Sequence, residues 1–149
     1  MLPYLHTVVL ALHVLFAAAW FGLGLALPSL ARGAMSPGTP EGGKVVGAMN
    51  GSIVLFYAAA VANWMLGMQL GLEAQYNAWP YHTALTLGLV LVVVQFGLIR
   101  PGWAGLTNGA GTPVAETGRK RIALGLGIGH AVWMGIFVLM YIGRGVIGG

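Results

Sequence analysis

The chain has 149 residues, of which 58% are hydrophobic and only 7% are charged. Soluble domains carry about 25% charged residues, so this composition predicts an integral membrane protein rather than a soluble one. The absence of cysteine excludes disulfides, iron–sulfur clusters, zinc–thiolate sites and covalent c-type haem attachment. The net charge of +4 comes from basic residues between apolar stretches, so we expect a lipid bilayer and no nucleic acid as partner.

The charged residues divide the sequence into four apolar spans, each long enough to cross a bilayer. We predict one transmembrane domain, residues 1–149, with spans at about residues 3–31, 45–72, 80–99 and 121–143. The first span lacks the positive start of a signal peptide and is too long for one, so we expect it to be retained. Pro80 suits the first turn of the third span. Arg100-Pro101-Gly102 is expected to end that span, which makes the stretch up to Gly118 the longest loop.

The basic residues lie mostly on one side of these spans. The loops after the first and third spans hold Arg32, Lys44, Arg100, Arg119, Lys120 and Arg121, whereas the other side holds Arg144. The positive-inside rule therefore predicts both termini outside, in a bacterial inner (plasma) membrane. The expected fold is an all-α, up-down, four-helix membrane bundle. Glycines within the spans permit close helix packing, including packing between copies of the chain in a homo-oligomer.

The first span carries His6, His13 and Trp20 at intervals of seven, which places the three side chains on one face of a helix. Imidazoles inside a membrane are costly without a partner and usually face the protein interior. Counting about 1.5 Å per residue from the outer ends of the spans pairs His6 with His82 near the surface. The same count pairs His13 with His130 at a deeper level.

Two imidazoles at one depth on different helices are what a bis-histidine haem b requires. His6 and His13 are only about 10.5 Å apart along one helix, too close for two stacked macrocycles, so we expect one haem. We predict His13 and His130 as its iron ligands, with His6 and His82 near the propionates. Trp20, on the same stripe as His13, is included among the cofactor-binding residues.

Copper is the alternative cofactor. His6 and His82 could bind it together with methionine thioethers, because imidazole and thioether suit this metal. The candidate methionines are Met65, Met68, Met134 and Met140. A further alternative is a structural subunit in which the histidines only hydrogen-bond neighbouring helices.

The segment from His13 to Leu30 resembles the first helix of the HemJ-type protoporphyrinogen oxidases and the related CopD-type copper-resistance proteins. That helix reads roughly His, six residues, Trp-Phe-x-Gly and then Leu-Pro-x-Leu. Here the matching residues are His13, Trp20-Phe21, Gly24, which is displaced by one position, and Leu27-Pro28-Ser29-Leu30. A second echo is Trp79-Pro80-Tyr81-His82. The resemblance implies that His13 binds haem b. It also implies a lysine early in the third helix, where this chain has Thr83. His82 or His130 must therefore replace it if haem is bound. The position of the motif favours His82, whereas the estimated depth in the membrane favours His130, which we prefer.

Catalytic groups are sparse, because the only carboxylates are Glu41, Glu73 and Glu116 in loops, so no buried acid–base pair is expected. The sequence therefore predicts a cytochrome b-like electron carrier that works with a quinone or a membrane redox partner. The alternatives are a HemJ-like porphyrinogen oxidase and a CopD-like copper-binding or transport protein. Whether the chain is an enzyme is left open.

Overall fold

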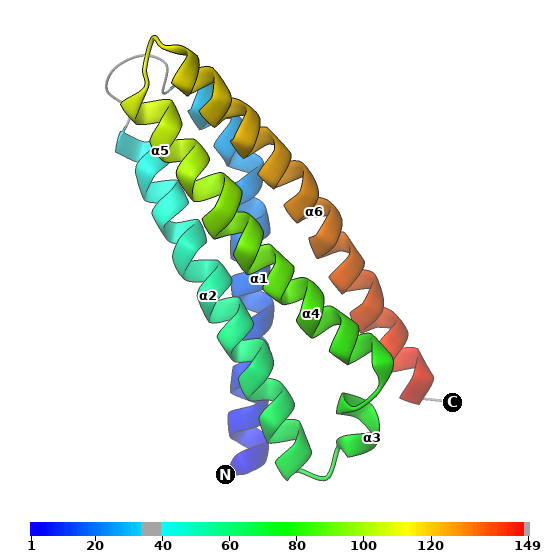
Figure 1. The fold of residues 1–149 in the computed structure, drawn as a ribbon. Helices are drawn as coiled ribbons and strands as arrows, with labels where there is room; N and C mark the ends of the chain where they lie inside the picture. The colour runs from blue at the N-terminus through cyan, green and yellow to red at the C-terminus, as the bar shows by residue number, and fades with distance from the viewer. Residues whose placement is uncertain (34–39, 148–149) are drawn as a thin grey trace.

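The computed structural model describes residues 1–33 and 40–147 of the chain, and these residues are helical with short connections. The helices are α1 (Leu2–Gly33), α2 (Pro40–Gln69), α3 (Glu73–Tyr76), α4 (Trp79–Val94), the π-helical turn η1 (Gln95–Ile99), α5 (Arg100–Asn108) and α6 (Pro113–Ile147). Four stretches are long and apolar enough to cross a membrane: Leu2–Arg32, Glu41–Gln69, Trp79–Asn108 and Pro113–Gly143. The predicted all-α, up-down architecture is thus confirmed for the described residues, with the start of α1 and the end of α6 at the same end of the bundle (Figure 1).

We call the end that holds the start of α1, α3 and the end of α6 the terminal end, and the end that holds α5 and the start of α6 the basic end (Figure 1). Helix α1 packs most extensively on α2, and α6 packs most extensively on α4 and α5. Contact between α1 and α6 is sparse by comparison. The bundle therefore consists of two helix pairs, and α6 leans away from α1 toward the terminal end (Figure 1).

The third long helix does not stop at Arg100-Pro101-Gly102, contrary to the sequence prediction. Proline in a helix clashes with the carbonyl four residues earlier, which for Pro101 is that of Gly97. Gly97 lies within η1, where the wider π turn gives that carbonyl room to move aside. The helix consequently continues to Asn108, and the connection to α6 shrinks to residues 109–112, with Gly111 in the left-handed region at φ +77°. Helix α6 begins at Pro113, ahead of the predicted residue 121, whereas Pro80 does lie in the first turn of α4 as expected.

A buried polar network joins the two helix pairs in the interior. The indole N–H of Trp20 donates to Gln95 Oε1 at 2.9 Å, and Gln95 Nε2 donates to Asn50 Oδ1 at 2.8 Å. Both Trp20 and Gln95 are fully buried. Because a buried amide without partners is costly, these bonds fix how α1, α2 and η1 sit relative to one another.

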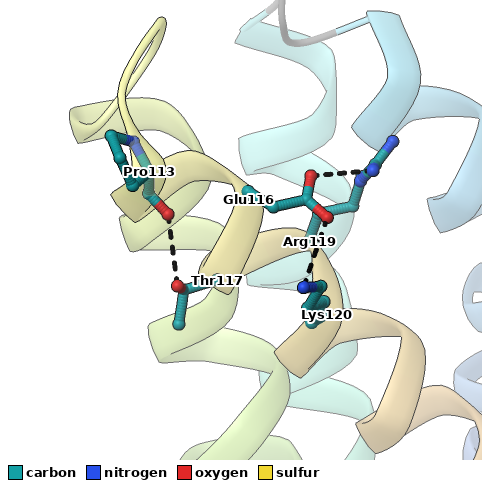
Figure 2. Close-up of polar contacts among 5 residues, drawn as sticks. All are labelled: Pro113, Glu116, Thr117, Arg119 and Lys120. Atoms are coloured by element: carbon teal, nitrogen blue, oxygen red, sulfur yellow. Dashed lines mark hydrogen bonds and ion pairs between the residues drawn. The ribbon is translucent and has the colours of Figure 1, made fainter.

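The first turns of α6 carry an exposed ion-pair cluster at the basic end. Glu116 contacts Arg119 at 2.7 Å and Lys120 at 3.8 Å, while the Thr117 hydroxyl donates to the Pro113 carbonyl at 3.2 Å (Figure 2). Exposed pairs of this kind contribute only up to about 1 kcal/mol. One carboxylate shared between two cations leaves the basic end with a net positive charge.

Gly118 lets α5 and α6 approach closely, and this contact provides a test of the packing. A Cβ at residue 118 would lie 2.5 Å from the Gly102 carbonyl oxygen and 2.6 Å from the Leu106 nitrogen, both backbone atoms that cannot swing aside. We expect Gly118→Ala to lower the free energy of unfolding by about 1–3 kcal/mol through overpacking. Gly127→Ala, on the same helix with nothing within 4 Å, is the control and should be neutral or stabilising. Thermal unfolding in detergent measures both, and equal melting temperatures for the two variants would contradict the packing.

Candidate functional site

A partly open cavity of about 450 Å³ lies between the two helix pairs, and we call the end of it that Gln75 and Tyr76 of α3 line the mouth. This volume is in the range of small-molecule and cofactor sites. One wall comes from α1 and α2, the other from α4 and α6, and the lining is mostly aromatic and aliphatic. Its principal side chains are His13, Ala17, Phe56 and Trp64 on the first wall and Tyr81, Leu85, Trp133, Phe137 and Met140 on the second. A gap between two apolar helix pairs suits a flat, largely apolar molecule.

Among the residues that the structure describes, His13 is the only histidine that lines this cavity. Its Nδ1 lies 3.2 Å from the carbonyl oxygen of Phe56, and its ring stacks on the Phe56 ring at 4.7 Å between centroids. A carbonyl oxygen can only accept, so Nδ1 carries the proton and Nε2 keeps its lone pair. Within the described residues, Nε2 has no hydrogen-bond partner, and it is not among the buried unpartnered atoms. A neutral imidazole whose second nitrogen donates to a carbonyl is the usual state of a metal-binding histidine.

The mouth of the cavity is closed partly by α3, which hydrogen bonds hold against α1 and α2. Asn63 Nδ2 donates to the Tyr76 hydroxyl at 3.1 Å, and that hydroxyl lies 2.8 Å from His6 Nε2, to which it can donate its own proton. On the other side, Gln75 Nε2 donates to the Tyr81 hydroxyl at 3.1 Å. Burial raises the pKa of Tyr76, and the hydrogen bond from Asn63 opposes that rise. Tyr76 was not predicted as a site residue, because only the fold brings α3 against α1.

The structure does not bring His13 and His130 together. The His130 ring packs edge-on against Phe21 at 4.7 Å, and a Cβ on Gly24 would lie 2.8 Å from His130 Nε2, an atom that is buried and unpartnered. Gly24 lies 11 residues from His13, about 16.5 Å along α1. The depth count started at Arg144, whereas α6 continues to Ile147, and these three residues account for about 4.5 Å of the offset. His130 therefore meets α1 nearer the basic end and does not line the cavity.

The other predicted site residues are also dispersed. Trp20 is fully buried with its N–H on Gln95, and it does not line the cavity. His6 is bonded to Tyr76, whereas His82 is exposed on α4 with its ring 6.5 Å from that of Trp64. Of the four methionines considered for copper, Met140 lines the cavity, and Met65 and Met134 are exposed. Among the described residues, no group of three or more His, Asp or Glu side chains could hold a metal ion.

Comparisons with known proteins do not identify a family. No family model matches the chain, and no curated protein or solved structure matches it either. The resemblance to HemJ-type and CopD-type proteins thus stays a prediction from residues of the first helix and the start of the third.

The Tyr76 hydroxyl gives a pH-dependent test of the closed mouth. Because its pKa in the folded protein lies above the ordinary value of 10.0, folded Tyr76 keeps its proton where the unfolded chain has lost it. Its contribution to stability is therefore present below pH 10.0 and is lost as the pH rises above it. We expect Tyr76→Phe to lower the unfolding free energy by about 1–2 kcal/mol at neutral pH and to reduce the loss of stability above pH 10.

Melting temperatures of the wild type and Tyr76→Phe across this pH range provide the measurement. Tyr4→Phe is the control, because Tyr4 is exposed on α1 and should behave as the wild type. If the wild type and Tyr76→Phe lost stability in parallel as the pH rose, the Tyr76 hydroxyl would not be buried and hydrogen-bonded to Asn63 and His6.

Proposed function

We propose that the four long helices cross a bacterial inner membrane, with the terminal end outside and the basic end in the cytoplasm. Large apolar side chains outside the cavity, such as Leu15, Leu25, Val93, Leu124 and Val138, are exposed on the long helices, as expected of a lipid-facing surface. Arg100, Arg119, Lys120 and Arg121 lie toward the basic end and favour the cytoplasmic side for it.

The absence of cysteine makes this orientation simple to test. Single cysteines at Asn77, between α3 and α4, and at Ala110, between α5 and α6, place one thiol at each end of the bundle. In intact cells, a membrane-impermeant maleimide should label Asn77→Cys and should reach Ala110→Cys only after permeabilisation. The reverse pattern would invert the orientation, and labelling of both in intact cells would argue against insertion.

We propose further that the cavity binds one b-type haem and that the protein transfers electrons, with a quinone or a membrane redox protein as partner. The observation that carries this proposal is the state of His13: its Nδ1 is tied to the Phe56 carbonyl while its ring forms part of the cavity wall. Bound haem would supply reversible one-electron chemistry at the iron. His130 has no part in this proposal, since it lies outside the cavity.

The residues present fit such a group. His13 offers a neutral nitrogen ligand, and the aromatic side chains Phe56, Trp133 and Phe137 offer apolar surface for the macrocycle. The mouth provides polar groups at Gln75 and Tyr81, near which propionates would reach the aqueous boundary. His13 lies well inside the bundle and these groups lie at its mouth, so one end of the cavity would hold the iron and the other the carboxylates.

The absorption spectrum of the purified protein, oxidised and then reduced with dithionite, tests haem binding. We expect a Soret band in the wild type and its loss in His13→Ala, since the ring nitrogen would be missing. His82→Ala is the matched control, because His82 is exposed and outside the cavity, and it should keep the spectrum.

Two results would overturn haem binding through His13. One is a wild type that takes up no haem even when reconstituted with haemin. The other is a His13→Ala variant with an unchanged spectrum. Copper found by metal analysis in a haem-free wild type would favour the copper-binding alternative instead.

A further inference from the structure

The cavity holds one histidine, so the second coordination position of an iron bound there depends on the opposite wall. A hydrogen bond from Trp133 Nε1 to the Ala17 carbonyl at 3.2 Å fixes the height of α6, which forms part of that wall, relative to α1. Because α1 and α6 are antiparallel, moving four residues from this bond toward the terminal end leads to His13 on α1 and to Phe137 on α6. These two residues therefore lie at about the same height in the bundle. Met140 follows Phe137 by three residues, about 4.5 Å along α6, and also lines the cavity.

Met140 is the best ligand on that wall by its chemistry. The other side chains there with donor atoms are the tyrosines Tyr81 and Tyr141. The Tyr81 hydroxyl already accepts a hydrogen bond from Gln75, and Tyr141 is 76% exposed. A tyrosine ligand must also lose its proton and place a negative charge in apolar surroundings, whereas a thioether binds iron as a neutral group.

The methionine side chain can also cover the offset in height. Three rotatable bonds let its sulfur adapt to an irregular space, in contrast to the rigid ring of Phe137, which the register places at the height of His13. Met140 is half-buried and packs against the buried apolar residues of the bundle core, which restricts the positions that its side chain can take.

We propose that Met140 supplies a second ligand, so that the nitrogen of His13 and the sulfur of Met140 would together hold the iron of a haem in this cavity. This inference rests on the proposed haem binding. A His–Met pair makes the iron six-coordinate and low-spin, and it raises the reduction potential relative to a bis-histidine site. With both axial positions filled, the site would carry electrons rather than bind oxygen.

The test compares Met140→Leu with Met134→Leu in haem-loaded protein. Leucine preserves apolar volume but removes the sulfur, and Met134 lies on the same helix, is exposed and does not line the cavity. We expect Met140→Leu to keep its haem but to become five-coordinate and high-spin, with rapid carbon monoxide binding to the reduced form. Met134→Leu should match the wild type. Met140→His should restore a low-spin spectrum with a lower potential than that of the wild type.

The unmodified protein provides a second measurement that needs no variant. Ferric haem with a thioether ligand has a weak far-red charge-transfer band, which we expect in the wild type. A high-spin wild type, or a low-spin Met140→Leu variant that still requires His13 for haem, would overturn the assignment of Met140 and leave haem binding intact. Failure of the wild type to bind haem would instead overturn the proposed function.

Discussion

The hydrogen bond from His13 Nδ1 to the Phe56 carbonyl is the interaction on which the candidate site depends. An imidazole inside an apolar bundle needs a partner, and a backbone carbonyl supplies one that cannot rotate away. The same bond selects the tautomer, because the carbonyl oxygen accepts and never donates. The ring is then held flat on Phe56, and its second nitrogen is left for a ligand. One contact between α1 and α2 thereby fixes both the orientation and the tautomer of the His13 ring.

The two ends of the bundle are built differently. Toward the basic end, Gly102 and Gly118 let α5 and α6 touch through backbone atoms, and the network of Trp20, Gln95 and Asn50 ties α1 and α2 to η1. Toward the terminal end, contact between the helix pairs gives way to a cavity. Directional bonds in the interior hold the helices in one arrangement where nonspecific apolar packing would permit several. A closed half of this kind keeps the walls of the open half in place.

Helix α3 connects the cavity to the aqueous boundary. It has only four residues, yet the Tyr76 hydroxyl meets side chains of both α1 and α2, and Gln75 meets Tyr81 at the start of α4. Gly67 leaves the space that the Tyr76 ring occupies.

The sequence by itself determined the four apolar stretches, the all-α up-down fold, the helix start at Pro80 and the orientation of His13 toward another helix. Each of these depends on local properties, namely the length of an apolar run, the fixed geometry of proline and the cost of an imidazole among apolar residues. Only the tertiary structure decided that the helix continues past Pro101, that His130 packs on Gly24, and that Phe56, Tyr76 and Met140 belong to the site. These features depend on a π turn and on the lean and offset of one helix against another. Helical period and hydropathy define the faces of a single helix, but they do not define its height or rotation relative to its neighbours.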